Sequence, residues 1–154
     1  MVFLQRVIII KTMNNARNIF GLVAVFLAAT ANAGTVANTL YLEARGEGER
    51  GVRAVASVIY NRSISTGKDF ESVCLKPFQF SCWNGSKTRV ITPKTDLDKK
   101  AYKLCLQVEK ELLEGNFKPL GEWTHYFNAR VCNPKWAAGI KQTKIGNHNF
   151  LKTK

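Results

Sequence analysis

The spacing of apolar residues changes part-way along the chain, and this change is the strongest constraint on the fold. Up to about residue 113, apolar residues recur every three to four positions, as they do on one face of a helix. After Gly121 the segments are short and rich in β-branched and aromatic residues, which is typical of strands. The sequence therefore predicts an α+β domain, with a helical lobe followed by a short antiparallel sheet.

Three helices and two strands are expected. The helices span residues 35–45, 50–65 and about 96–113, and the strands span 124–131 and 141–151. Thr95 or Asp96 is the expected N-cap of the third helix, because a short polar side chain there accepts a hydrogen bond from the first turn. Residues 67–93 contain glycines and prolines and are expected to form a long ordered loop. A loop of this length in a compact domain usually carries function.

The first 33 residues have the layout of a secretory signal peptide. Three basic residues precede an apolar run over residues 19–29, and Ala31 and Ala33 fit a small-residue cleavage site. This run is too short for a bilayer span, which needs roughly 17–25 apolar residues. The sequence thus predicts export and cleavage after Ala33, which leaves a mature domain over residues 34–154. An uncleaved N-terminal anchor is the alternative.

The mature chain would be strongly basic. Without the three basic residues of the first segment, 20 lysines and arginines stand against 11 acids, a net charge of +9. Such a charge favours contact with polyanions. Export argues against nucleic acid and leaves anionic envelope polymers as the expected electrostatic partners. A basic surface that only keeps the protein soluble is the alternative, and we expect a monomer.

All four cysteines lie in the mature part, at Cys74, Cys82, Cys105 and Cys132. An even number in a small exported domain predicts two disulfides, and the sequence leaves all three pairings open. Zinc is disfavoured because the chain has no C-x-x-C pair, and no other metal or cofactor is expected. An oxidising compartment also disfavours a Cys–His nucleophile pair.

Residues 42–49, LEARGEGE, hold the densest group of titratable side chains. Glycosidic bond cleavage needs a carboxylic acid that an apolar setting keeps protonated. Glu43 fits this role because its neighbours in the predicted helix are apolar, whereas Glu47 and Glu49 lie among glycines and are expected to be exposed. Glutamates near an arginine are also common on a solvated surface, so this motif is weak when taken alone.

Two further segments contain residue types that bind sugars. Residues 77–84, PFQFSCWN, combine aromatic rings with amides and hydroxyls. Gln79 and Trp83 are expected to face a ligand, whereas Phe78 and Phe80 are expected to lie in the core. Residues 124–128, THYFN, read as a strand in which Tyr126 and Asn128 share one face, with His125 on the other or redirected by a bulge. A structural and a functional role for His125 are equal alternatives, and His148 is expected to be structural.

These motifs occur in the same order in a known family, and the chain resembles bacterial cell-wall hydrolases of the spore-cortex-lytic type. The matching segments are LYLEARGE (40–47), GVRAVASVIYNR (51–62), VC (73–74), QFSCW (79–83), THYFN (124–128), PKWA (134–137) and IGNHNF (145–150). Phe78 departs from the pattern, since many relatives have a small residue there.

The resemblance implies a lysozyme-related fold and a peptidoglycan substrate, cleaved between N-acetylmuramic acid and N-acetylglucosamine. It implies a lytic transglycosylase in which Glu43 protonates the glycosidic oxygen and the 6-hydroxyl of the muramic acid closes an anhydro ring. The residues expected to bind the substrate are Glu47, Gln79, Phe80, Trp83, His125, Tyr126 and Asn128. A muramidase-type hydrolase and a non-catalytic cationic wall-binding protein are the alternatives.

Overall fold

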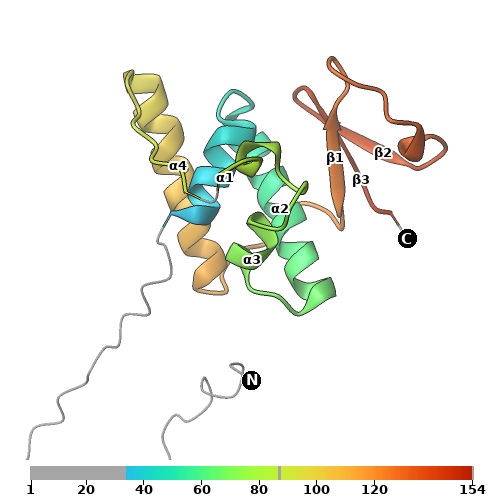
Figure 1. Ribbon diagram of the computed structural model, residues 1–154, viewed down its shortest axis with the longest axis horizontal. Coiled ribbons are helices and arrows are strands. Elements are labelled where there is room, and N and C mark those ends of the chain that lie inside the picture. The colour runs from blue at the N-terminus through green and yellow to red at the C-terminus, as the bar shows by residue number, and fades with distance from the viewer. Residues whose placement is uncertain (1–33, 87, 154) are drawn as a thin grey trace, which may run out of the picture. The chain divides into compact units, whose positions relative to one another are not determined.

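Helices come first along the chain and strands last (Figure 1). The computed structural model describes residues 34–86 and 88–153, so the predicted signal peptide over residues 1–33 lies outside the described part. The elements are, in order, α1 (Thr35–Ala44), α2 (Gly48–Thr66), α3 (Phe70–Cys74), η1 (Ser81–Trp83), α4 (Asp96–Leu113), β1 (His125–Asn128), η2 (Lys135–Ala137), β2 (Gln142–Ile145) and β3 (His148–Leu151). This order confirms the predicted α+β class. None of the described helices is both long enough and apolar enough to cross a membrane.

A carboxylate of α4 holds the start of α1. Glu109 is buried, and its Oε1 accepts hydrogen bonds of 3.1–3.2 Å from the backbone N–H groups of Gly34, Val36 and Ala37. The first turn of a helix leaves these donors without intrahelical partners. The N-cap residue Gly34 has no side chain to accept them. Glu109 therefore caps α1 from another helix.

The start of α4 agrees with the sequence. Thr95 is the N-cap, and its Oγ1 accepts a hydrogen bond from the backbone N–H of Asp98 at 3.1 Å. In return, the Asp98 carboxylate accepts from the backbone N–H of Thr95 at 3.3 Å. This reciprocal arrangement satisfies two donors that the helix cannot. Of the two predicted N-caps, Thr95 is the correct one.

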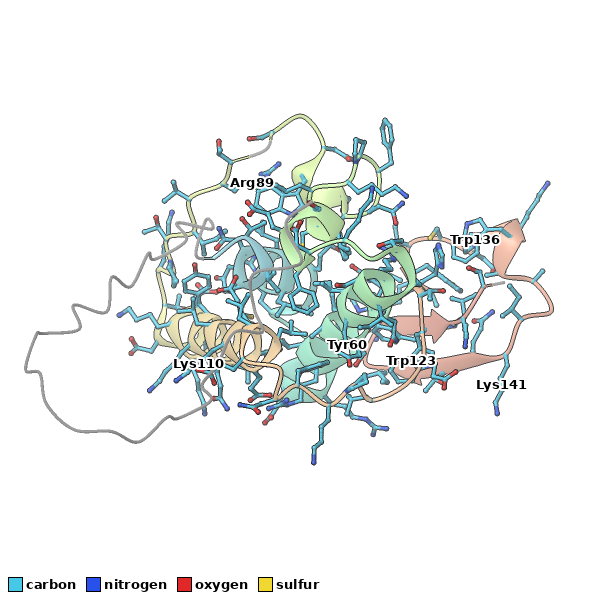
Figure 2. All side chains as sticks on the ribbon, turned by 90° about the horizontal axis from the view of Figure 1, so that it is seen from below. Tyr60, Arg89, Lys110, Trp123, Trp136 and Lys141 are labelled. Atoms are coloured by element: carbon cyan, nitrogen blue, oxygen red, sulfur yellow. The ribbon has the colours of Figure 1, made fainter. Side chains whose placement is uncertain are left out.

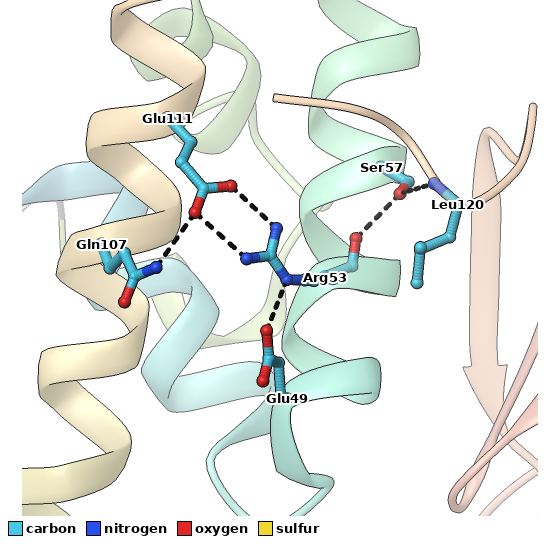
Figure 3. Close-up of polar contacts among 6 residues, drawn as sticks. All are labelled: Glu49, Arg53, Ser57, Gln107, Glu111 and Leu120. Atoms are coloured by element: carbon cyan, nitrogen blue, oxygen red, sulfur yellow. Dashed lines mark hydrogen bonds and ion pairs between the residues drawn. The ribbon is translucent and has the colours of Figure 1, made fainter. Parts of the chain in front are cut away.

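Arg53 joins α2 to α4 (Figure 3). Its guanidinium donates two hydrogen bonds to Glu111, of 2.8 and 3.1 Å, and one to Glu49, of 2.8 Å. These hydrogen bonds with Glu111 and Glu49 raise the pKa of Arg53. One turn further along α2, Ser57 donates to the Arg53 carbonyl and accepts from the backbone N–H of Leu120. The same helix thus also holds the segment that leads to the sheet.

The sheet has one more strand than the sequence predicted. Its order is β1-β3-β2 with both pairings antiparallel, because residues 141–151 form a hairpin and not a single strand. The chain reverses at Gly146 and Asn147, and Gly146 has a φ of 58°, which glycine adopts without strain. The inward face of β3 places Phe150 in the main core, where it contacts Trp123 with ring centroids 5.2 Å apart. Trp123 is labelled in Figure 2, next to the strands.

The predicted loop over residues 67–93 contains two short helices, α3 and η1. Phe80 is buried, as expected, but the expectation for Phe78 was wrong, since its side chain is 88% exposed. Phe78 has a φ of 62° within a turn in which the backbone N–H of Gln79 donates to the carbonyl of Lys76. This turn directs Phe78 away from the core.

The predicted disulfides are absent from the structure, in which all four cysteines are free. Cys105 is buried in α4, whereas Cys132 is exposed on the connection after β1. The remaining pair have other partners, since the Cys74 thiol interacts with Thr39 and the Cys82 thiol with Glu43. Burial raises the pKa of Cys74 and of Cys105 to about 12, so both remain protonated.

Candidate active site

Three segments meet at the carboxylate of Glu43. This residue lies in the last turn of α1 and is partly buried. The hydroxyl of Tyr126, from β1, donates to Glu43 Oε2 at 2.8 Å. On the other oxygen, Oε1 accepts a longer hydrogen bond of 3.3 Å from the backbone N–H of Cys82, and the Ser81 hydroxyl lies at 3.5 Å. The structure thus brings the predicted acid together with the loop and with the strand.

Aromatic rings hold Tyr126 in place. Its ring stacks on Phe150 with centroids 5.4 Å apart and meets the edge of His148 at 5.1 Å. Phe80 packs against it from the loop, with ring centroids 6.4 Å apart. Burial, and then the negative charge and hydrogen bond of Glu43, raise the pKa of Tyr126 well above its usual value. The hydroxyl therefore keeps its proton and acts as a donor to Glu43 at neutral pH.

Cys82 is not suited to act as a nucleophile. Burial raises the pKa of its thiol well above the usual range, and the neighbouring carboxylate of Glu43 raises it further. Because the thiolate is the reactive form, this environment keeps the thiol inert. The contribution of Cys82 to the site is its backbone N–H.

Glu47 is held by Asn147, at the turn between β2 and β3. The backbone N–H and the side-chain Nδ2 of Asn147 donate to the two carboxylate oxygens, each at 2.8 Å. Burial alone would raise the pKa of Glu47, but the two Asn147 donors, followed by the charges of His148 and Arg130, lower it below its usual value. Both oxygens of this second carboxylate are thus engaged by the sheet.

The predicted sugar-binding residues of the loop separate into two cavities. Gln79 lines a cavity of about 450 Å³ together with His125, whereas Trp83 lines another of about 370 Å³ with residues 75–78 and 84–86. Trp83 is otherwise buried and donates from Nε1 to Thr39 Oγ1 at 2.8 Å. Phe80 is fully enclosed in the core. Phe80 therefore packs against the Tyr126 ring from within the core.

The strand β1 directs its side chains as the alternation predicts. Tyr126 faces Glu43, whereas His125 is on the other face and contacts the edge of the Trp136 ring, with centroids 5.6 Å apart. Burial, followed by the charge of Arg62, lowers the pKa of His125. Asn128, at the end of the strand, accepts a hydrogen bond from the backbone N–H of Arg130 through its Oδ1. The structure brings Tyr126 to the acid, but gives Asn128 a local partner.

Several residues of the site were not found from the sequence. His148 is buried against Tyr126, with an Nδ1 atom that has no hydrogen-bond partner, so a fully satisfied structural role was not the right expectation. Asn147 was missed because the turn was read as part of a strand, although Gly-Asn between apolar residues signals a hairpin. Arg62 was not singled out, although it follows Val55 by seven positions and Ile59 by three, which places it on the apolar face of the helix. Within residues 34–86 and 88–153, no cluster of three His, Cys, Asp or Glu side chains is arranged to hold a metal ion.

Comparisons with known proteins identify a family and two similar solved structures. The family model described as cell wall hydrolase matches residues 46–151, a range that begins after Glu43. The catalytic domain of the germination-specific lytic transglycosylase SleB from Bacillus anthracis is 29% identical, with a TM-score of 0.58 over 79% of this chain and 93% of that one. The catalytic domain of SleB from Bacillus cereus is 30% identical, with a TM-score of 0.55 over 79% and 89% of the two chains. No curated protein matches the sequence.

Proposed function

The chain belongs to the cell wall hydrolase family, and from this premise we propose that it cleaves the glycan strand of peptidoglycan with Glu43 as the general acid. As a member of this family it is a peptidoglycan-degrading enzyme. The observation that carries the assignment of Glu43 is its 2.8 Å hydrogen bond with Tyr126, which ties the acid to a second, distant segment of the chain.

The two oxygens of Glu43 have different roles in this proposal. Oε2 is held by Tyr126, whereas the contacts of Oε1 with Cys82 and Ser81 are longer. We therefore assign the reactive proton to Oε1. Its transfer to the glycosidic oxygen breaks the bond between that oxygen and the anomeric carbon, and leaves an oxocarbenium-like sugar and a Glu43 carboxylate.

The fate of that sugar distinguishes a transglycosylase from a hydrolase. An inverting hydrolase needs a second carboxylate to activate water. The nearest candidate in sequence is Glu47, but both its oxygens accept hydrogen bonds from Asn147. The arrangement therefore favours attack by the sugar's own 6-hydroxyl, whose proton returns to Glu43 as the anhydro ring closes. Only one carboxylate is then needed, first as acid and then as base.

Digestion of purified peptidoglycan tests both parts of the proposal. Mass spectrometry of the products should find muropeptides with anhydro ends, each one water lighter than a hydrolytic product. Products with ordinary reducing ends would instead identify a muramidase. Glu43→Gln keeps the shape of the side chain and removes the acid, so we expect a rate loss on the order of a hundredfold or more.

A matched variant controls for the loss of a carboxylate as such. Glu114→Gln removes an exposed acid after α4, far along the chain from the site, and should digest peptidoglycan at the parental rate. Undiminished activity of Glu43→Gln would refute the assignment. It would leave a cationic protein that disrupts envelopes by charge, an activity that high salt abolishes.

We also propose that residues 1–33 direct export and that residues 34–154 form the catalytic domain. The proposal is supported by the layout of the first segment and by the location of a peptidoglycan substrate outside the cytoplasm. N-terminal sequencing of the exported protein should begin at Gly34. A product that retains the preceding residues would instead indicate an N-terminal anchor.

A further inference from the structure

Arg62 carries a partly buried charge for which the described part of the chain shows no ion pair. This residue of α2 donates from Nε to the Thr124 carbonyl at 2.7 Å, and its guanidinium lies 5.4 Å from the centroid of the Phe80 ring. Its Nη1 is buried without any hydrogen-bond partner. Burial lowers the pKa of Arg62, so the fold works against this charge. A buried cation is usually paired with an anion.

The larger cavity has the composition of an anion site. Its volume is about 450 Å³, which is within the range of small-molecule sites. The lining residues are Arg62, Ser65, Thr66, Lys68, Val73, Lys76, Gln79, Thr124, His125, Lys152 and Thr153. Four of these are lysine or arginine and none is acidic. Lys152 also pairs with the exposed Glu122 at 2.8 Å, whereas Lys68 and Lys76 form no ion pair that the structure describes.

The cavity is close to the candidate active site without containing the acid. Glu43 is not among its lining residues. Arg62 covers the Phe80 ring, Phe80 contacts Tyr126, and Tyr126 binds Glu43. One aromatic layer thus separates the cationic cavity from the site of bond cleavage. A branch of the substrate, as opposed to its sugar backbone, is suited to this place.

We propose that this cavity binds a carboxylate of the peptide stem that branches from the muramic acid. The inference rests on the proposed function, because the substrate must be peptidoglycan. The stem is the part of that substrate that carries free carboxylates, whereas the N-acetylglucosamine units are neutral. A carboxylate bound there accepts a charge-assisted hydrogen bond from the Arg62 guanidinium and is attracted by the ammonium groups of Lys68 and Lys76. The enzyme would thus select glycan strands that carry acidic stems.

Binding of an isolated stem fragment tests the inference without catalysis. The probe is the dipeptide L-alanyl-D-glutamate, titrated calorimetrically into the whole mature protein beside its fully amidated form and inorganic phosphate. We expect the free acid to bind about tenfold or more tightly than the amide, and Lys68→Met/Lys76→Met to remove this difference. Lys103→Met/Lys144→Met removes two exposed lysines outside the cavity and should bind as the parent does.

Three results of this titration would overturn the inference. They are the absence of any binding by the parent, equal binding of the acid and the amide, and phosphate binding as tight as that of the peptide. The last result would indicate a general anion site and not one for a stem carboxylate. Arg62→Lys adds a second measurement, since it keeps the charge but loses the planar fork, and we expect it to weaken binding of the free acid.

A comparison of two substrates separates this inference from the proposed function. Intact peptidoglycan is digested beside glycan strands from which an amidase has removed the stems. We expect Lys68→Met/Lys76→Met to lose about tenfold more activity on the intact substrate than on the stripped strands. Equal losses would refute stem recognition and leave the glycosidase assignment standing. If the parent cleaves neither substrate, the proposed function fails, and the dipeptide titration still decides whether the cavity binds carboxylates.

Discussion

Removal of a single hydroxyl group tests how the acid is held. Tyr126→Phe deletes the donor to Glu43 Oε2 but keeps the ring that packs on Phe150, Phe80 and His148. A hydrogen bond to a charged group contributes about 1.5–3 kcal/mol. If that interaction serves to position Glu43 in the transition state, its loss should lower kcat by roughly 10- to 150-fold. KM should change little, because the hydroxyl is engaged by the enzyme's own carboxylate.

The chain offers a closely matched control for this variant. The hydroxyl of Tyr41 donates to a carboxylate oxygen of Asp98, in the first turn of α4, at 2.9 Å. Tyr41→Phe therefore loses the same kind of interaction, and both variants should unfold at similarly reduced temperatures. Only Tyr126→Phe should lose kcat, measured as the rate at which soluble muropeptides appear from purified peptidoglycan. Equal losses of kcat in both variants, or an unchanged kcat in Tyr126→Phe, would refute a positioning role for Tyr126.

Three further substitutions test the elements around the site. Gly146→Ala should lower activity and stability together, because a Cβ there would collide with the carboxylate of Glu47 and because the φ of 58° disfavours alanine. A variant that unfolds in urea at the parental concentration and digests peptidoglycan at the parental rate would contradict this. Glu47→Gln should have a lower free energy of unfolding than the parent at neutral pH, and this difference in free energy should become smaller in acid. The folded pKa lies below 4.5, so this carboxylate stabilises the fold above that pH and loses its effect as the pH falls through the folded pKa; a gap independent of pH would count against the reasoning. Thr95→Ala should cost about 1 kcal/mol of unfolding free energy in urea through loss of the N-cap, with kcat unchanged, whereas Thr88→Ala in the exposed loop should cost less.

The helical part of the fold was predictable because its signals are local. Apolar spacing and capping residues placed the helices within two residues of α1, α2 and α4. The sheet was predicted less well. The Gly146-Asn147 dipeptide signals a hairpin turn, but the β-rich residues on both sides led to residues 141–151 being read as one strand, which the structure divides into β2 and β3.

The disulfide prediction rested on the number of cysteines and on the compartment, and not on their positions, and the structure contains no disulfide. Four cysteines in a small exported domain favour two bridges, but a bridge requires that two side chains approach each other. The helical register of α4 directs Cys105 into the core, whereas Cys132 is on an exposed connection. The apolar spacing of the third predicted helix predicts the burial of Cys105, but no pattern along the chain places Cys132.

The sequence predicted which residues meet at the acid better than it predicted what surrounds them. Strand alternation is enough to put Tyr126 on the face opposite His125, and the structure adds that this face meets α1 at Glu43. The burial of Arg62 depends on packing between α2, the loop and the segment before β1, which are far apart in sequence. The apolar periodicity of α2 places Arg62 on the buried face, but it does not give the partners of Arg62 or the lysines around the cavity, which only the structure brings together.

The acid lies where the helical lobe, α1 to α4, meets the sheet. Substitutions at this junction should therefore affect activity and stability differently from substitutions elsewhere in the fold. Polar contacts that link the two parts include Tyr126 with Glu43, Asn147 with Glu47, and Arg62 with the carbonyl before β1. Two of these three involve a glutamate at the end of α1 or just after it. Substitutions at this junction should therefore reduce turnover per folded molecule, because they move the acid relative to the strand. Substitutions that weaken α4 should reduce only the fraction of folded molecules, since α4 supplies none of the hydrogen bonds to Glu43.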